Sequence, residues 1–438
     1  MKTKIPVVRK ELLFPFIIIT SLFALWGIAN DLTNPMVSAF KKVMPELSNT
    51  QASLVQFAFY FGYFFMALPA ALFIRKYSYK SGIVLGLALY AIGAFLFYPA
   101  AVNAEFTYFL ISLWVITCGL AFLETTSNPL ILSLGDRETA TQRLNLAQAF
   151  NPVGSLFGMI IAQVFVINAL RSDDYTREAY NALPVEEIAV IRDNDLSVIS
   201  LPYIGLGLLV VLIMVVVIFM KFPKSIEEEK ISISDSFKKL FANKNYVQGV
   251  VTQAFYVGAQ IMCWTYIFQY VDNLNETQGW SLTATYFNVA AMVSFLVGRW
   301  IGTALMKRIN PSKILMLFGI GGVVCSAGAV VLPGMAGLIS LVSVSVFMSI
   351  MFPTIYGIAL KDMGDEAKIG SAGLVMAIVG GALMPVLQGS ILDWGGPGFS
   401  DEKILGYIPE VNFSFILPLI CLTVVAYYGY STYKSSKI

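Results

Sequence analysis

The stretch Gly119-Leu-Ala-Phe-Leu-Glu-Thr-Thr-Ser-Asn-Pro-Leu130 places a carboxylate, Glu124, inside an apolar segment at 104–134 that is long enough to cross a lipid bilayer. No Lys or Arg lies near Glu124 in the sequence, and the chain contains no His. A charged side chain at the centre of a membrane helix costs roughly 3 kcal/mol or more, so such residues are rare and mark functional sites. The stretch therefore predicts a membrane protein with a functional carboxylate in one of its helices.

The composition of the whole chain agrees with a membrane protein. Hydrophobic residues make up 57% of the 438 residues and charged residues only 13%, against about 45–50% and 25% in soluble domains. The net charge of +2 gives no basic surface for nucleic acid, so we expect none as a partner. The partner expected for a chain of this composition is the lipid bilayer.

A window of about 20 residues, the length of a membrane-spanning helix, finds about twelve apolar spans in the chain. The fold class predicted from them is an all-α membrane protein with twelve transmembrane helices. The spans are expected near 12–40, 51–75, 82–101, 104–134, 143–170, 198–221, 246–272, 281–306, 312–332, 336–360, 370–393 and 409–433.

Two polar segments interrupt the apolar pattern. The segment 171–196 carries many Asp and Glu residues and is expected to be a solvated loop. A charged segment after 221 divides the chain into an N-terminal six-helix bundle at 1–221, a cytoplasmic linker at 222–245 and a C-terminal six-helix bundle at 246–438. About 22 of the 29 Lys and Arg fall in alternate loops on one side, which the positive-inside rule assigns to the cytoplasm. Both termini are then cytoplasmic, and a multi-pass protein of a bacterial inner membrane is expected.

The two halves repeat a short motif. Ala71-Leu72-x-x-Arg75-x-x-x-x-Lys80 follows the second span, and Ala304-Leu305-x-x-Arg308-x-x-x-x-Lys313 follows the eighth with the same spacing. Simple cytoplasmic anchoring explains any one of these basic residues, but the matched spacing favours a shared gating role in the cytoplasmic loops. The repeat predicts two pseudo-symmetric six-helix bundles, a design common in transporters.

Polar and aromatic side chains form stripes along four of the predicted helices, at the spacing of three or four residues that puts them on one helix face. Amides and carboxylates bond hydroxyl groups, and aromatic faces cover sugar rings, so the stripes favour a neutral, hydroxylated solute. The alternative is that these residues join helices by hydrogen bonds. The candidate substrate-binding residues are Trp26, Asn30, Asn34, Glu124, Asn128, Gln148, Asn151, Gln253, Tyr256, Gln260 and Trp264, with Asn145 on the same stripe as Gln148 and Asn151.

Asp31 and Glu124 are the candidates for proton coupling. Burial disfavours the charged form of a carboxylate, so each can exchange a proton near neutral pH, and without His any proton carrier must be a carboxylate. The alternative for Asp31 is a structural partner of Asn34 or a position near the outer interface. The four Cys lie inside apolar spans without a CxxC pair, so we expect no metal site and no cofactor.

Several segments together resemble the fucose–galactose–glucose:proton symporter family of the major facilitator superfamily. The resemblance implies the major facilitator fold, alternating access between two bundles, and a sugar site lined by Glu124, Gln148 and Asn151. The substrate it implies is L-fucose, or otherwise a hexose of the galactose or glucose type. The segments that carry it are Leu22-Phe-x-Leu-Trp26-x-x-Ala-Asn30, Phe59-Tyr-Phe-Gly-Tyr63, Leu123-Glu-Thr125 with Asn128-Pro129, Arg143-Leu-Asn-Leu-Ala-Gln148-x-Phe-Asn151 and Tyr256-Val-Gly-Ala-Gln260-x-x-Cys-Trp264.

The chain departs from the family pattern in its first span. Where the fucose transporters of the family have a proton-carrying aspartate, this chain reads Asn30-Asp31-Leu32-Thr33-Asn34, so its carboxylate lies one turn earlier. Asp31 can serve from the same helical face, which is a hypothesis. The coupling ion is then a proton or, alternatively, sodium.

Other functions remain open from the sequence. Within the transporters, the alternatives are a sodium-coupled sugar symporter and an uncoupled facilitator. A different class is a membrane enzyme acting on a lipid-linked sugar with Glu124 and Asp31 as an acid–base pair, but the chain has no sizeable soluble domain for such chemistry. We therefore expect a transporter and not an enzyme. It is expected to work as a monomer, because two bundles in one chain need no partner subunit.

Overall fold

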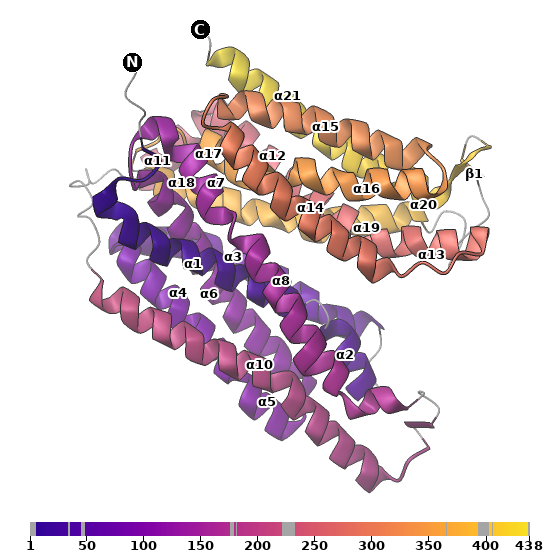
Figure 1. The fold of residues 1–438 in the computed structure, drawn as a ribbon. Helices are drawn as coiled ribbons and strands as arrows, with labels where there is room; N and C mark the ends of the chain where they lie inside the picture. The colour runs from indigo at the N-terminus through magenta and orange to yellow at the C-terminus, as the bar shows by residue number, and fades with distance from the viewer. Residues whose placement is uncertain are drawn as a thin grey trace. The chain divides into compact units, whose positions relative to one another are not determined.

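The computed structural model is built almost wholly of helices and describes residues 6–33, 36–44, 49–175, 179–180, 182–220, 233–364, 366–392, 403–404 and 406–436 (Figure 1). The long helices of the N-terminal half are α1 (Leu13–Thr33), α3 (Asn49–Lys76), α4 (Tyr79–Phe95), α6 (Phe106–Ser133), α8 (Asn151–Ile161) and α10 (Val185–Phe219). Shorter elements of this half are η1 (Lys10–Leu12), α2 (Met36–Val43), α5 (Phe97–Asn103), η2 (Arg137–Thr139), α7 (Ala140–Gln148), η3 (Ala162–Val166), η4 (Ile167–Ala169) and η5 (Arg171–Asp174).

The C-terminal half contains the remaining helices and one small β-hairpin, in which Lys403 pairs with Pro409. Its elements are α11 (Ile233–Ala242), α12 (Lys244–Thr265), α13 (Ile267–Gln278), α14 (Ala284–Leu305), α15 (Pro311–Val331), α16 (Gly334–Met348), α17 (Met351–Ala359), α18 (Glu366–Met376), η6 (Ala377–Val379), α19 (Gly380–Leu392), β1 (Lys403–Ile404), β2 (Ile408–Pro409), α20 (Glu410–Ser414) and α21 (Ile416–Ser435).

Eleven helical segments in the described part of the chain are long and apolar enough to cross a membrane. They correspond to all the predicted spans except the seventh, where α12 lies. α12 has the length of a span, with 22 residues, but it carries Gln248, Gln253 and Gln260 in addition to charged Lys244. Its amides lower its hydropathy, so α12 is the predicted span that the eleven apolar helical segments of the described residues do not include.

Several predicted spans consist of two consecutive helices, and proline marks where some of them restart. α8 begins at Asn151 with Pro152 in its first turn, and α17 begins at Met351 with Pro353 close behind. Proline is tolerated there because the first turn of a helix needs no donor from its N–H groups. The fifth and tenth spans are therefore interrupted at Ala149–Phe150 and near Ile350.

The described residues form two compact units. One contains 11–130 and 150–228, and the other contains 1–10, 131–149 and 229–438. In the first unit α1 packs along α8, and α4 packs along α10. The contact of α1 with α8 is very close at Gly154, where an added Cβ would overlap the carbonyl group of Ala24.

The second unit repeats these pairings with the corresponding helices of the C-terminal half. α12 packs along α19, and α15 packs along α21. Gly380 of α19 meets the carbonyl of Ala254 in α12, just as Gly154 meets that of Ala24. The matched pairs and the matched glycines are what two related six-helix halves would produce.

In both halves the lysine of the repeated basic motif contacts the last helix of its own half. The Nζ of Lys80, at the start of α4, donates to the carbonyls of Ile218 and Met220 at the end of α10, at 2.6 and 3.0 Å. Lys313, at the start of α15, lies over the ring of Tyr433 near the end of α21, with 5.9 Å from Nζ to the ring centroid. Lys80 is hydrogen-bonded to the last helix of its half, whereas Lys313 lies near an aromatic ring of the last helix of its own half.

The acidic segment before the sixth span is more ordered than the sequence indicates. α10 begins at Val185, well before the predicted span, and Asp195 within it is fully buried. The Asp195 carboxylate accepts hydrogen bonds from the backbone N–H groups of Arg171 and Ser172, both at 2.9 Å. The prediction of a solvated loop is wrong for this residue, because its charge is satisfied by backbone donors.

Candidate transport site

α1 presents the first group of predicted site residues. Trp26 is buried beside Phe23, with 4.8 Å between ring centroids, and Asp31 is only 7% exposed. Asn30 is half-buried, and its Oδ1 atom is buried without a hydrogen-bond partner among the described residues. Helical spacing brings these three residues into one region of α1. Asn34, the remaining member of the predicted stripe, lies outside the described residues.

α6 carries Glu124 at mid-helix, where it is half-buried. The ion pairs within the described residues do not include Glu124. Asn128 is fully buried one turn later, and its Nδ2 donates to the backbone carbonyl of Glu124 at 3.0 Å. That bond keeps the amide against its own helix. The Glu124 carboxylate is left for a proton or a polar ligand.

α3 brings two tyrosines to these carboxylates. Tyr60 interacts electrostatically with Asp31, and Tyr63 interacts with Glu124. Tyr63 also lies next to Trp26. Tyr63 is buried, and its ring lies edge-on to that of Phe59 with 5.9 Å between centroids.

The stripe predicted on the fifth span is divided between two helices. Asn145 on α7 donates from Nδ2 to Oγ1 of Thr354 at 3.1 Å, and its Oδ1 accepts from the same hydroxyl at 3.4 Å. Gln148 ends α7 and is 6% exposed. Asn151 begins α8, and its Nδ2 donates to the carbonyl of Phe23 on α1 at 3.2 Å. Asn145 and Asn151 thus join helices, as the alternative reading of the amides expected.

α12 presents the stripe predicted for the seventh span. Gln253 is 0% exposed, and neither Nε2 nor Oε1 of its amide has a hydrogen-bond partner among the described residues. Tyr256 is also fully buried, with its ring edge-on to that of Phe352 at 6.3 Å. Leaving a buried amide without partners costs about 1–3 kcal/mol, so Gln253 is a strong candidate for a ligand contact.

The last two residues of the same stripe, Gln260 and Trp264, are less buried, and one of them has a hydrogen-bond partner. Gln260 is half-buried. Trp264 is also half-buried, and its Nε1 donates to Oγ of Ser345 at 3.2 Å while its ring meets Phe295 edge-on at 5.1 Å. The indole N–H is therefore occupied, and Trp264 can offer a ligand only its ring surface.

Two buried arginines donate hydrogen bonds to backbone carbonyls in and around α7. The sequence predicted no transport role for either of them. Arg143 is 0% exposed and donates to the carbonyls of Ile131, Leu132 and Val7 at 2.6–3.0 Å. It thereby satisfies acceptors left open at the end of α6. Arg299 on α14 donates to the carbonyl of Gln148 at 2.9 Å and to that of Ser349. Neither set of carbonyl partners could be inferred from sequence spacing.

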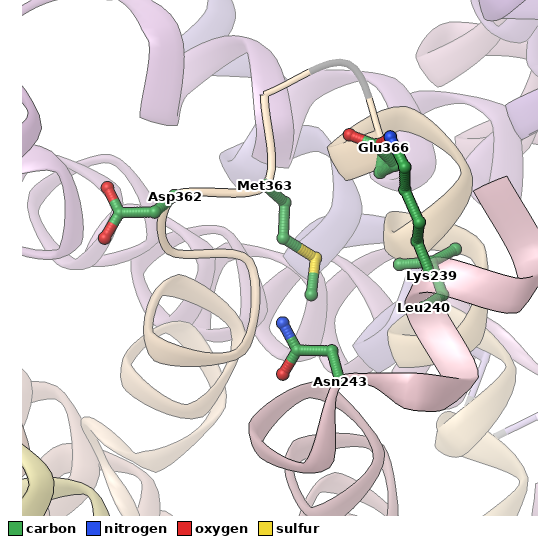
Figure 2. A pocket seen from close by; sticks show the side chains of 6 residues that line it. All are labelled: Lys239, Leu240, Asn243, Asp362, Met363 and Glu366. Carbon is green, nitrogen blue, oxygen red and sulfur yellow. The ribbon is translucent and has the colours of Figure 1, made fainter. Parts of the chain in front are cut away.

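A small cavity of about 210 Å³ lies elsewhere, between α11 and the turn that joins α17 to α18 (Figure 2). Lys239 and Glu366 on its wall form an ion pair of 2.8 Å. None of the predicted substrate-binding residues lines it. The cavity is lined by Lys239, Leu240, Asn243, Asp362, Met363 and Glu366.

Comparison with known proteins shows which class of protein this chain belongs to. The model of the Major Facilitator Superfamily matches residues 13–387, and the chain belongs to that superfamily. The predicted fold class, an all-α membrane protein with twelve transmembrane helices in the major facilitator fold, is thereby confirmed, and the chain is a multi-pass membrane transporter rather than an enzyme.

Particular relatives narrow the class. The chain is 51% identical to an L-fucose-proton symporter of Haemophilus influenzae, over 98% of this chain and 99% of the relative. It is 32% identical to an L-fucose-proton symporter of Escherichia coli, over 95% and 92%. A crystal structure of the major facilitator transporter FucP in the outward conformation matches with a TM-score of 0.85 and 31% identity, covering 97% of this chain and 99% of the other. The family resemblance predicted from the motifs is confirmed.

Proposed function

We propose that this protein imports L-fucose together with a proton by alternating access. The observation that carries the proposal is that the chain matches an L-fucose-proton symporter over 98% of its length and also holds a half-buried carboxylate, Glu124, in a transmembrane helix. In this scheme Glu124 and Asp31 carry the proton. The amide of Gln253 and the ring of Tyr256 contact the sugar from α12, and Trp26 and Asn30 contact it from α1.

Sugar binding by these groups follows from their chemistry. A buried primary amide offers two donors and an acceptor with two lone pairs, which match the hydroxyl groups of a monosaccharide. Gln253 and the Oδ1 of Asn30 have this capacity unused among the described residues. Trp26, Tyr256 and Trp264 provide aromatic surface for the apolar faces of a sugar ring. We assign Asn34, Asn128, Gln148, Asn151 and Gln260 to the same site as neighbours or supports.

The cellular arrangement follows the charge pattern of the loops. We place the protein in the bacterial inner membrane with both termini in the cytoplasm, and divide it at the linker 222–245 into bundles 1–221 and 246–438. The protein works as a monomer in this proposal. Arg75, Lys80, Arg308 and Lys313 act on the cytoplasmic side, where Lys80 and Lys313 anchor the last helix of each half and Arg75 and Arg308 take part in gating.

The substrate is tested by uptake of labelled sugars into membrane vesicles with an imposed inward proton gradient. We expect accumulation of L-fucose, and weaker or no accumulation of galactose and glucose. The same assay with sodium in place of the proton gradient separates the two coupling ions. Accumulation driven by sodium alone would contradict the proposal, as would equilibration of L-fucose without accumulation under either gradient.

The position of the carboxylate on the first span is tested by moving it. Asp31→Asn removes the carboxylate, and the double change Asp31→Asn with Asn34→Asp restores it one turn later, where the fucose transporters of the family carry theirs. We expect the single variant to lose proton-driven accumulation and the double variant to regain it. Retention of full accumulation by Asp31→Asn alone would show that Asp31 is a structural residue.

A further inference from the structure

α14 supplies none of the predicted sugar contacts, yet it buries a charged side chain, that of Arg299, which is only 3% exposed. The ion pairs within the described residues do not include Arg299. Burying a charge is costly unless an opposite charge or well-placed dipoles compensate it. The hydrogen-bond partners of the guanidinium group therefore have to provide that compensation.

These partners are backbone carbonyls at two helix ends. Nη1 of Arg299 donates to the carbonyl of Gln148, the last residue of α7, at 2.9 Å. Nε donates to the carbonyl of Ser349, the residue that caps the C-terminus of α16. The last carbonyls of a helix lack intrahelical donors and carry a partial negative charge, so a cation is favourable at both places. One side chain thus joins the interruptions of the fifth and tenth spans.

Close packing of α14 against α16 holds the guanidinium group in place. An added Cβ on Gly298, the residue before Arg299, would come within 2.5 Å of the carbonyl oxygen of Val346. Cζ of Arg299 also lies over the ring of Phe295, one helical turn earlier, at 4.7 Å from the ring centroid. A guanidinium group is planar and its N–H donors have fixed directions, so holding it in place also fixes its acceptors.

The face of α14 that carries Arg299 also contacts a second predicted sugar residue, Trp264 of α12. The ring of Phe295 meets the Trp264 ring edge-on at 5.1 Å, and Nδ2 of Asn288 donates to the Trp264 carbonyl at 3.1 Å. Asn288, Phe295 and Arg299 follow at intervals of seven and four residues, which places them on one helix face. This face of α14 therefore supports one predicted sugar residue on α7 and another on α12.

We propose that Arg299 positions the sugar site: it holds the end of α7 in the place from which the Gln148 amide reaches L-fucose, and does not touch the sugar itself. This inference rests on the proposed function, because it requires Gln148 to belong to the sugar site. It gives α14 a role in transport. It also accounts for the burial of a charge there, because a cation is attracted to two helix ends more strongly than a neutral donor is.

The test measures the affinity for L-fucose and the thermal unfolding of the full chain on the same preparation. Arg299→Met removes both donors, and we expect the affinity to fall roughly tenfold, about what the loss of one hydrogen bond causes. Arg299→Lys keeps the charge but lacks the planar pair of donors. We expect it to lower the affinity less, by about threefold, because one ammonium group can still attract both carbonyls.

A double variant separates positioning from general damage. If Arg299 acts through Gln148, the amide is already misplaced in Arg299→Met. The double variant Arg299→Met/Gln148→Leu should then bind L-fucose no more weakly than Arg299→Met alone, whereas two unrelated defects would multiply. Gln148→Leu alone should lower the affinity without loosening α7, because Arg299 bonds the backbone carbonyl of Gln148 and not its side chain.

Arg143→Met is the matched control. Arg143 is also fully buried and donates to backbone carbonyls, but to those of Ile131, Leu132 and Val7 and not to the end of α7. We expect this variant to unfold more easily and to keep the affinity of the wild type for L-fucose. An equal fall in affinity in Arg143→Met and Arg299→Met would overturn the inference, because any loss of stability around α7 would then suffice.

The remaining outcomes also decide the inference. Unchanged affinity in Arg299→Met would show that Arg299 only joins helices, and would leave the proposed function standing. Multiplied effects in the double variant would show that Arg299 does not act through Gln148. If Arg299→Met does not fold, Arg299→Lys and Arg299→Lys/Gln148→Leu decide by the same comparison. Absence of L-fucose binding by the wild-type chain would refute the proposed function, and the inference with it.

Discussion

α7 and α12 both bury polar side chains, but the two helices differ in whether those side chains have hydrogen-bond partners. On α7, Arg143 donates hydrogen bonds to backbone carbonyls, and Asn145 is hydrogen-bonded to the hydroxyl of Thr354. On α12, the amide of Gln253 is equally buried and has no partner among the described residues. Both helices show polar residues at helical spacing, so the spacing alone does not separate a structural amide from a ligand-binding one. The hydrogen-bond partners do.

The largest effect is expected on the α7 side. Arg143→Met leaves the carbonyls of Ile131, Leu132 and Val7 without their buried donor, and we expect a loss of about 3 kcal/mol in the free energy of unfolding. Thermal unfolding in detergent measures it. The matched control is Arg137→Met, since Arg137 is exposed and its ion pair with Asp362 is long, at 3.5 Å. An equal loss in both variants would contradict the assignment of Arg143 as a buried anchor.

Gln253→Leu tests the other side of the comparison. The substitution removes an amide without partners, so the melting temperature should stay the same or rise. The affinity for L-fucose should fall by roughly tenfold or more, which corresponds to a lost hydrogen bond of about 1.4 kcal/mol. Binding titration and thermal unfolding on the same preparation give both values. A destabilised variant with unchanged affinity would place Gln253 with the structural amides.

The smallest effect is expected for Asn145→Leu. It breaks the pair with Thr354, and interhelical hydrogen bonds of this kind contribute about 1 kcal/mol in membrane proteins. Unfolding should therefore become slightly easier while the affinity for L-fucose is unchanged. If sugar affinity falls and stability does not, Asn145 belongs to the binding site and the distinction between α7 and α12 fails.

Much of the architecture follows from the sequence because lipid restricts the chain to internally bonded helices. Apolar length located the spans, and the matched spacing of Arg75–Lys80 and Arg308–Lys313 predicted the repeat. The shared use of Lys80 and Lys313 at the ends of α10 and α21 agrees with that prediction. Their part in gating stays a prediction.

The site was predicted less completely, because partners distant in sequence decide which polar group is free. The spacing of Trp264 suggested a ligand contact, but its N–H is taken by Ser345, 81 residues away. Asp195 lies in a charged segment, yet it is buried and accepts hydrogen bonds from two backbone N–H groups.

The most direct measurement is the external pH of a lightly buffered, de-energised suspension of cells expressing this chain when L-fucose is added. Proton symport predicts an alkaline shift in the wild type, and no shift with Glu124→Gln, because the amide cannot carry the proton. Uptake of labelled L-fucose by the wild type without any shift in pH would contradict the account.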